Sequence, residues 1–541
     1  MDETQPQSAD GSLLAAQQVS FSAQVRKHLP FLLLLAYLGI VFHGVLFATQ
    51  GVYERDAFYH ARYSQLLPER GLSREFPWMQ FTVWNHAFAD KDFLYHVLLA
   101  PFCLLWPEAL DGAKFGTIVM ALAALTAVYA LLCRLKAPWP ILWVLLLAFG
   151  SGLFLNRLLM VRSHVLSISL MVVAWYAIMR ARFWPCFAVA FVYAWSYSVP
   201  LGMLATAVAA EAGRRLLTKP AEWHPRTILA TALGLGAGLV VHPYSPHSLY
   251  SLWMFLRISA AGAMGGPVEL GSEFRPLRPG DVMPALAGLV GALLVAVAGA
   301  VLLRQGAVKG RALSAPAAAA LGAALAWFAA MFVFMRMVEY FAPLAIIAAA
   351  LVARDWAGDG PPFRAVSPQQ RPRVLACALA CVLLVAGLHE FSLLGVREVL
   401  RTKRPYFPSE QAWQRGRYFA GAAEWMSKNL KPHATVINFH WDDFPELFYA
   451  APRQYYLVGL DPTFMRLAYP EHMAVLERMR TEAAPLDFAT LGRLFNSEYV
   501  IMRRYRAAEY ALLKSRAVQP VYEDETAVIY RTGFQATAAA Q

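Results

Sequence analysis

Long runs of apolar residues, separated by short polar segments, make up most of the chain between residues 29 and 396. The first run, residues 29–49, contains about 20 residues, which is the length that an α-helix needs to cross a bilayer. The same rule predicts further spans at roughly 113–133, 139–156, 158–180, 183–199, 200–213, 227–243, 281–303, 312–334, 337–353 and 374–396. The pattern therefore predicts a polytopic α-helical membrane protein with about eleven transmembrane helices.

Three regions of different character divide the chain. Residues 1–28 are polar and rich in Gln, Ser and Ala, which predicts a disordered cytoplasmic tail. Residues 29–396 form the predicted transmembrane domain, with large outer loops at 50–112 and 244–280. Beyond residue 397, strand-like segments alternate with helix-like ones, which predicts an extracytoplasmic α/β domain over residues 397–541.

The charges of the loops predict the orientation. Cytoplasmic loops of membrane proteins carry an excess of Lys and Arg. With a cytoplasmic N-terminus, the basic loops lie inside, the short outer hairpins carry only Arg157 and Arg336, and the C-terminal domain lies outside. The short apolar run 93–106 would invert this order if it crossed the membrane, so we predict an interfacial helix there. These features predict a multi-pass protein of a bacterial inner membrane.

The overall composition excludes several classes of protein. Hydrophobic residues make up 58% of the chain and charged residues 16%, whereas a soluble chain carries roughly 25% charged residues. A net charge of +12 would suit a nucleic-acid partner, but the basic residues lie mainly in the predicted inner loops, so no nucleic-acid partner is expected. The five Cys form no CxxC motif and indicate no disulfide framework.

Acidic residues of the outer loops are candidates for chemistry. If the string ERDAFYHAR is helical, Asp56 and His60 share one face, and Asp56 could act as a general base. Asp90 and Asp92, in the string DKD, could hold a divalent metal such as Mg or Mn, and so could Glu269 in the second outer loop. The alternative for each is an ordinary solvated turn or loop surface.

Two arginines at outer helix ends are candidates for binding an anion. Guanidinium groups bind phosphate through paired hydrogen bonds, so Arg162 and Arg336 would suit an anionic lipid headgroup. The alternatives are snorkelling to the membrane surface, or a pair between Arg336 and Glu339 three residues later.

The C-terminal region contains the unusual string HWDD directly after a predicted strand at 434–439. Trp441, Asp442 and Asp443 stand where α/β folds place ligand-binding groups, and their side chains suit sugar or peptide binding. The alternative is that Asp443 caps the helix that follows.

Together these features resemble the GT-C superfamily of membrane glycosyltransferases, which includes oligosaccharyltransferase catalytic subunits and protein mannosyltransferases. The string from Asp56 to Arg62 is similar to the D-x-x-Y-H-x-R form of oligosaccharyltransferase-like proteins, and the segment around Arg336 is similar to their helix-end Arg segment. HWDD is placed like their WWDYG acceptor motif, but only the Trp and one Asp match.

The resemblance implies a transferase that takes a sugar or oligosaccharide from a polyprenyl phosphate or diphosphate donor. The acceptor would be a lipid, a glycan or a protein on the outer side of the membrane. Asp56 would be the catalytic carboxylate, Arg162 and Arg336 would stabilise the departing lipid phosphate, and His60 would contact substrate. Two other functions stay open, a transporter or flippase of lipid-linked saccharides and a non-catalytic scaffold with the same fold.

Overall fold

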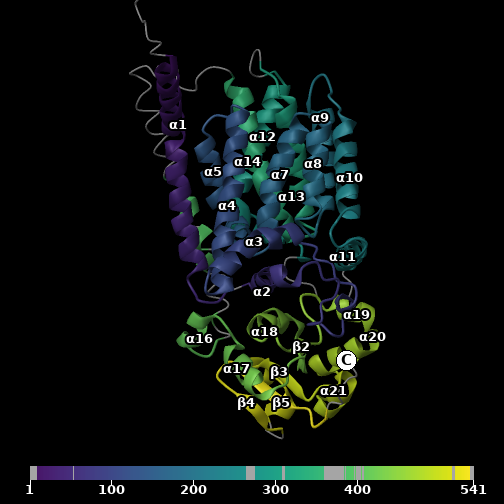
Figure 1. Ribbon diagram of the computed structural model, residues 1–541. Helices are drawn as coiled ribbons and strands as arrows, with labels where there is room; N and C mark the ends of the chain where they lie inside the picture. Colours follow the sequence, from purple (N-terminus) through teal and green to yellow (C-terminus); the bar gives the residue numbers. More distant parts are fainter. Residues whose placement is uncertain are drawn as a thin grey trace, which may run out of the picture.

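The computed structural model describes residues 9–52, 54–263, 274–306, 311–358, 407–514 and 518–535, with isolated positions between 383 and 404. A bundle of helices forms one part of the molecule, and the C-terminal domain packs on one end of it (Figure 1). Two short helices of the first outer loop, α2 (Asp56–Arg70) and α3 (Phe93–Leu105), lie between the two parts (Figure 1).

Each span predicted up to residue 353 overlaps a helix of the bundle. These helices are α1 (Ala9–Leu46), α4 (Ala109–Arg134), α5 (Pro140–Phe149), α6 (Gly152–Leu158), α7 (His164–Met179), α8 (Phe183–Tyr193), α9 (Leu201–Leu217), α10 (Pro225–Val240), α12 (Val282–Arg304), α13 (Ala315–Ala330) and α14 (Val338–Ala357). The last predicted span, 374–396, falls largely outside the described residues.

The number of spans stays a prediction. In the described part of the chain, four helices are long and apolar enough to cross a bilayer alone, and a fifth span results if α5 and α6 count as one. The chain bends by 89° between α5 and α6, where a single span was predicted. Several other helices of the bundle are apolar but only 10–17 residues long.

The N-terminal tail differs from its prediction, because α1 begins at Ala9 and not near residue 29. Leu, Ala and Gln favour helix, and a helix that has already formed extends more easily than a new one starts. The polar composition of this segment therefore did not indicate its local structure.

Small residues bring the bundle helices close together. Gly234 and Gly238 of α10 face the backbone of α8, and a Cβ built on either would lie within 2.5 Å of the Phe187 or Phe191 carbonyl oxygen. The string GLGAG is thus a packing surface between helices. Helix α14 is buried along almost its whole length, so it forms the centre of the bundle.

Helix α3 was predicted as an interfacial helix, and the structure has a helix of that length at the end of the bundle. Val97, Leu98, Leu104 and Leu105 are exposed on it, while Leu99 is buried. The exposed apolar face suits contact with lipid at the membrane surface. The outer loops also contain η1 (Val83–Asn85), α11 (His247–Ala263), η3 (Pro279–Asp281) and η4 (Met335–Met337).

The C-terminal domain contains the predicted alternation of strands and helices. Its sheet has five strands in the order β2-β1-β3-β5-β4, which are β1 (Thr435–Asn438), β2 (Tyr455–Tyr456), β3 (Tyr499–Arg503), β4 (Pro520–Glu523) and β5 (Ala527–Arg531). Strand β1 is parallel to β2 and β3, with Ile437 opposite Val500, whereas β5 is antiparallel to β3 and β4. The pattern of the sequence did not predict β4, which is half exposed.

Helices cover this sheet and join it to the membrane part. They are α16 (Glu410–Arg415), α17 (Ala420–Asn429), η6 (Trp441–Asp443), α18 (Phe444–Ala450), α19 (Thr463–Ala468), α20 (Pro470–Arg480), α21 (Phe488–Phe495), α22 (Arg504–Ala507) and α23 (Ala511–Lys514). Helix α18 packs on α2, and the Phe76 ring of the first outer loop packs edge-on against Phe444 and at a tilt against Phe448 of α18. One apolar core therefore connects the first outer loop with the C-terminal domain.

Candidate active site

The candidate site lies at the N-terminal end of α2, where the bundle meets the C-terminal domain. The backbone N–H groups of Asp56 and Ala57 donate to the Glu54 carboxylate over 3.0 and 3.1 Å. This contact satisfies two of the free donors at a helix start and fixes the position of Asp56. Asp56 and His60 are one helical turn apart, as predicted, and line the same cavity.

That cavity, which we call the α2 cavity, has a volume of about 120 Å³. It is lined by three carboxylates, three basic side chains and two imidazoles, among mostly aromatic neighbours. The charged and imidazole groups are Asp56, Asp92, Asp461, Lys91, Arg162, Arg336, His60 and His164. A pocket with this many charges in a partly apolar wall suits an ionic ligand, because few waters compete for the charged groups.

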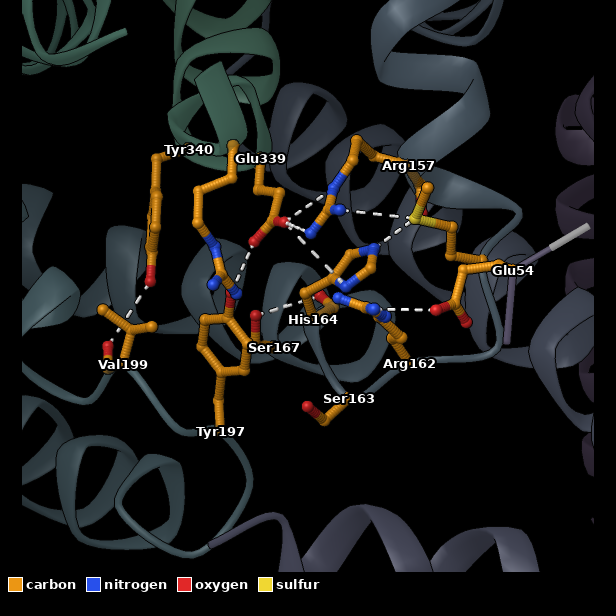
Figure 2. Close-up of polar contacts among 12 residues, drawn as sticks. Glu54, Arg157, Arg162, Ser163, His164, Ser167, Tyr197, Val199, Glu339 and Tyr340 are labelled. Carbon is orange, nitrogen blue, oxygen red and sulfur yellow. Dashed lines mark hydrogen bonds and ion pairs between the residues drawn. The ribbon is translucent and has the colours of Figure 1, made fainter. Parts of the chain in front are cut away.

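Arg162 links the two acidic residues at the start of α2. Its Nη2 lies 2.5 Å from Oδ2 of Asp56 and 2.7 Å from Oε1 of Glu54. Figure 2 shows Arg162 reaching toward Glu54. Arg162 therefore offsets part of the negative charge at the start of α2 and stands in direct contact with the proposed catalytic carboxylate.

A second group of charges, completely buried, supports the wall of the cavity from the side of the bundle (Figure 2). Nε of Arg157 donates to Oε1 of Glu339 over 2.9 Å, and the Tyr197 hydroxyl donates to Oε2 of Glu339 over 2.7 Å. Arg336 in turn donates to the Tyr197 hydroxyl over 2.7 Å, and only 6% of Arg336 is exposed.

This network contains both Arg336 and Glu339, the pair that the sequence suggested, together with Arg157 and Tyr197. Glu339 forms its ion pair with Arg157, and Tyr197 stands between Glu339 and Arg336. Arg336 also lies over the Phe274 ring, with 4.9 Å from its guanidinium carbon to the ring centroid. Tyr197 and Phe274 thus help to hold Arg336 in place while it lines the α2 cavity.

Of the proposed metal ligands, Asp90 and Asp92 lie close together, and each is bound by another side chain. Asp90 contacts His96, whereas Oδ1 of Asp92 accepts a hydrogen bond from Ser163 over 2.7 Å. Glu269 lies outside the described residues. Across the residues that the structure describes, no three His, Cys, Asp or Glu side chains are grouped as metal ligands. Because these residues do not assemble a ligand set, we derive no step that passes through a metal ion.

The HWDD string lies elsewhere, beside a second cavity of about 300 Å³ that we call the domain cavity. Asp442 lines it together with Arg506, whose Nη1 and Nη2 lie 2.7 and 2.9 Å from the Asp442 carboxylate. Asp443 is buried and contacts Arg503; it stands at the N-cap position of α18, as the alternative expected, but its side chain makes no capping hydrogen bond. Trp441 packs against the core of the C-terminal domain.

Burial and ion pairing act differently on the two adjacent carboxyls. Burial by itself raises the pKa of Asp442, but the charges of Arg503 and Arg506 outweigh it and hold that pKa well below its usual range. Burial raises the pKa of Asp443 to about 6, although Arg503 opposes the shift. Asp442 is therefore the permanently charged member of the string.

Helix α2 separates the two cavities. Arg55 and Phe58 line the domain cavity, whereas Asp56 and Tyr59 line the α2 cavity. Residues three apart on a helix share a face, so neighbouring positions at the start of α2 point into different cavities. The structure thus places Asp56, His60, Arg162 and Arg336 together, and places Asp442 across the helix from them.

Some residues of the site were missed from the sequence. Lys91 lies within the DKD string but was not considered as an anion-binding group, although it lines the α2 cavity. Asp461 lies just after a strand-like segment, which is a position typical of ligand-binding residues. Arg503 and Arg506, which pair with Asp442, are more than 60 residues from it in the chain and gave no sequence signal.

Comparisons with known proteins find a similarity of fold but none of sequence family. No protein-family model and no curated protein matches the sequence. The archaeal oligosaccharyltransferase AglB from Archaeoglobus fulgidus, solved with an inhibitory peptide and a dolichol-phosphate, matches with a TM-score of 0.52 and 13% identity over 90% of this chain and 71% of that chain.

Two other solved transferases match over most of this chain. ArnT from Cupriavidus metallidurans, bound to undecaprenyl phosphate, matches with a TM-score of 0.50 and 14% identity over 94% of this chain and 99% of that one. The arabinofuranosyltransferase AftD from Mycobacteria matches with a TM-score of 0.51 and 13% identity over 93% of this chain and 40% of that one. These enzymes belong to the GT-C superfamily, and the chain described here has the GT-C glycosyltransferase fold.

Proposed function

We propose that this protein is a glycosyltransferase that moves a sugar or oligosaccharide from a polyprenyl-phosphate-linked donor to an acceptor on the extracytoplasmic side of the membrane. The observation that carries the proposal is the α2 cavity, where Asp56 faces Lys91, Arg162 and Arg336 at the junction of bundle and domain. The GT-C fold supports it, because the similar proteins AglB and ArnT were solved with dolichol-phosphate and undecaprenyl phosphate.

The donor phosphate would bind to the basic groups of the α2 cavity. Arg336 is already fixed by Tyr197 and Phe274, so little side-chain entropy is lost when it binds a phosphate oxygen. Charge-assisted hydrogen bonds of this kind stabilise a phosphate by about 1.5–3 kcal/mol each. The same groups would stabilise the negative charge that grows on the phosphate as it leaves.

Arg162 would couple donor binding to the state of Asp56. Its Nη2 contacts Asp56 and Glu54, and a phosphate that bound to this guanidinium would compete with both carboxylates. A carboxylate that loses its cation is a stronger base, because the cation favours its charged form. Donor binding would therefore prepare Asp56 to accept a proton.

The reaction would be a direct displacement at the anomeric carbon. The acceptor oxygen or nitrogen forms a bond to this carbon and gives its proton to Asp56, while the bond to the phosphate oxygen breaks and the polyprenyl phosphate leaves. A single displacement inverts the configuration. Among the residues that the structure describes, no group of metal ligands is assembled, so this scheme assigns its steps to side chains of the chain.

The acceptor would approach from the domain cavity. This cavity adjoins the start of α2, and its lining combines Asp442 with Arg506, Tyr418 and Tyr505. Aromatic rings and charged groups together suit a polar acceptor such as a glycan, a peptide or a lipid headgroup. Arg55, which precedes Asp56, lies 3.5 Å from Glu446 in this cavity.

The proposal is tested by assaying Asp56→Asn in the purified full-length chain, with polyprenyl-phosphate-linked sugars as donors and release of polyprenyl phosphate as the readout. The Asn side chain keeps the size of Asp but removes the base, so transfer should fall by about 10²–10⁴-fold while donor binding persists. Asp281→Asn, an exposed position at the start of α12, is the matched control and should leave transfer unchanged. Near-normal transfer by Asp56→Asn would assign the chemistry to another group.

A further inference from the structure

A chain of hydrogen bonds between buried side chains ends at the α2 cavity. Nδ1 of His96 lies 2.9 and 2.8 Å from the two carboxylate oxygens of Asp90, and Nε2 of His96 lies 2.8 Å from Nδ1 of His60. Asp90, His96 and His60 are 2%, 1% and 5% exposed. His60 lines the cavity, whereas Asp90 and His96 lie behind it. The chain connects α2 to α3, which lie side by side.

When both imidazoles are neutral, the chemistry of the first member sets the direction of every bond. A carboxylate only accepts hydrogen bonds. Nδ1 of His96 therefore carries a hydrogen and donates a hydrogen bond to Asp90. In a neutral imidazole the other nitrogen then has a lone pair, so Nε2 of His96 accepts from Nδ1 of His60. By the same rule Nε2 of His60 is the lone-pair nitrogen, and none of the described residues forms a hydrogen bond with it.

The surroundings keep His60 neutral and hold both rings in place. Burial lowers the pKa of His60 well below its usual value, and the neighbouring His96 and the positive charges of Arg162 and Lys91 lower it further. The ring of Tyr95 packs edge-on against His60, and that of Tyr63 packs edge-on against His96, with centroid distances of 5.4 and 4.9 Å. Neither imidazole can turn over without breaking the chain of bonds.

We infer that Asp90 and His96 hold His60 in one tautomer, so that Nε2 of His60 accepts a hydrogen bond from a hydroxyl group of the sugar in the α2 cavity. His60 is then a specificity-determining residue, and Asp90 and His96 are positioning residues that act through it. This inference rests on the proposed function, because it assigns the sugar of the donor to the α2 cavity.

The charges that line the cavity explain why Nε2 of His60 would accept from a hydroxyl group and not contact the phosphate. A phosphate oxygen has no proton at its ionised positions, and its charge would repel the lone pair of His60. The phosphate is matched instead by Lys91, Arg162 and Arg336. His60 is one turn from Asp56 on the same face of α2. A sugar whose anomeric carbon stands near Asp56 would therefore bring a neighbouring hydroxyl group to His60.

Binding measurements on the full-length protein test this inference. The probes are undecaprenyl phosphate, bare or carrying a hexose or a pentose. We expect the wild type to bind one of the glycosylated lipids more tightly than the bare lipid. His60→Asn and His60→Gln should both bind that lipid roughly threefold to tenfold more weakly, the range for one hydrogen bond, with unchanged affinity for the bare lipid. His86→Asn, an exposed position in the same loop, is the matched control and should behave as wild type.

The outcomes separate this inference from the proposed function. If neither the wild type nor any variant binds undecaprenyl phosphate, the proposed function itself fails. If the bare lipid binds but the His60 variants lose no preference for a sugar, the proposed function stands and the role of His60 is wrong. A wild type that binds all the lipids equally overturns the inference in the same way.

A spectroscopic readout tests the positioning role. In protein labelled with ¹⁵N-histidine, the signal that disappears in His60→Asn should show a protonated Nδ1 and an unprotonated Nε2 at neutral pH. Asp90→Asn can donate to His96, so it should shift this signal toward the other tautomer and reduce the preference for the sugar. A protonated Nε2 on His60 in the wild type would overturn the inference.

Discussion

At the scale of single residues, the site depends on which charges are paired and which face the cavity. Asp56 touches Arg162, Glu339 touches Arg157, and Arg336 is held by the Tyr197 hydroxyl and the Phe274 ring. Breaking a buried ion pair leaves an uncompensated charge and destabilises a protein strongly. Arg157 and Glu339 therefore stabilise the structure around the site. Arg336 lines the α2 cavity and can bind a ligand there while it keeps its contacts with Tyr197 and Phe274.

Arg336→Ala is expected to weaken binding of undecaprenyl phosphate by about tenfold to a hundredfold, because one charge-assisted contact to phosphate is worth about 1.5–3 kcal/mol. Arg336→Lys should recover part of the loss, since it restores the charge but not the paired hydrogen bonds. Equilibrium binding in detergent measures both. Arg278→Ala, which removes an exposed arginine near the start of α12, is the control. A folded Arg336→Ala protein with wild-type affinity would limit Arg336 to a structural contact with Tyr197.

At the scale of elements, α2 is the part that organises the site. Its first residue is Asp56, its N-terminal N–H groups bond to Glu54, and its successive residues point into two different cavities. Glu54 both caps α2 and contacts Arg162, so it belongs to the surroundings that fix Asp56.

Glu54→Ala is therefore expected to lower thermal stability and transfer together. Loss of a helix cap destabilises by roughly 0.5–2 kcal/mol, and the loss also frees Arg162 from one of its two carboxylates. Melting temperature and initial rate of transfer measure the two effects. Glu69→Ala, at an exposed position near the other end of α2, should change neither quantity. Unchanged transfer in Glu54→Ala would show that α2 keeps Asp56 in place without its cap.

The C-terminal domain is expected to lose stability in acid through His440. Burial, with Arg506 nearby, lowers the pKa of His440 from 6.5 to about 2. As the pH falls below 6.5, the unfolded chain binds a proton on His440 that the folded chain does not, so the unfolding free energy decreases by about 1.4 kcal/mol per pH unit.

Replacing His440 by Gln removes this titration, so the melting temperature of His440→Gln should decrease less than that of wild type between pH 7 and pH 5. Comparing the two proteins cancels the opposite contribution of Asp443, whose raised pKa makes the folded state the stronger proton binder in this range. Parallel changes of melting temperature with pH in the two proteins would show that His440 titrates in the folded state as it does in the unfolded chain.

At the scale of the whole molecule, the α2 cavity lies where the bundle and the C-terminal domain meet, and both parts line it. Arg162 and Arg336 come from the bundle, Asp56 and Lys91 from the first outer loop, and Asp461 from the C-terminal domain. The site therefore requires the C-terminal domain and the outer loops to lie on the same side of the membrane.

The positive loops predict that this side is extracytoplasmic. A reporter fused after Gln541 should be active only outside the cytoplasm, because the N-terminus is expected inside and the number of spans odd. A matched fusion within the basic segment 214–226 should report the cytoplasm. Cytoplasmic activity of the C-terminal fusion would place the site on the inner side and exclude the proposed outer reaction.

The sequence by itself determined the membrane character, the positions of most helices and the α/β character of the C-terminal domain, and it led to the hypothesis about the segment around Asp56. These features follow from local patterns, because the length of an apolar run and the spacing of polar residues act within a few turns of chain. The resemblance in the string ERDAFYHAR was a local signal of the same kind.

Only the tertiary structure decided which charges meet. The partner of Asp56 is Arg162 and that of Glu339 is Arg157, residues 106 and 182 positions apart, whereas Asp90 contacts a histidine rather than a group of metal ligands. Such contacts depend on how helices from distant parts of the chain pack, and a single sequence contains no local pattern for them. The separation of Asp442 from Asp56 by α2 is likewise a consequence of packing, because neighbouring residues on one helix point into two different cavities.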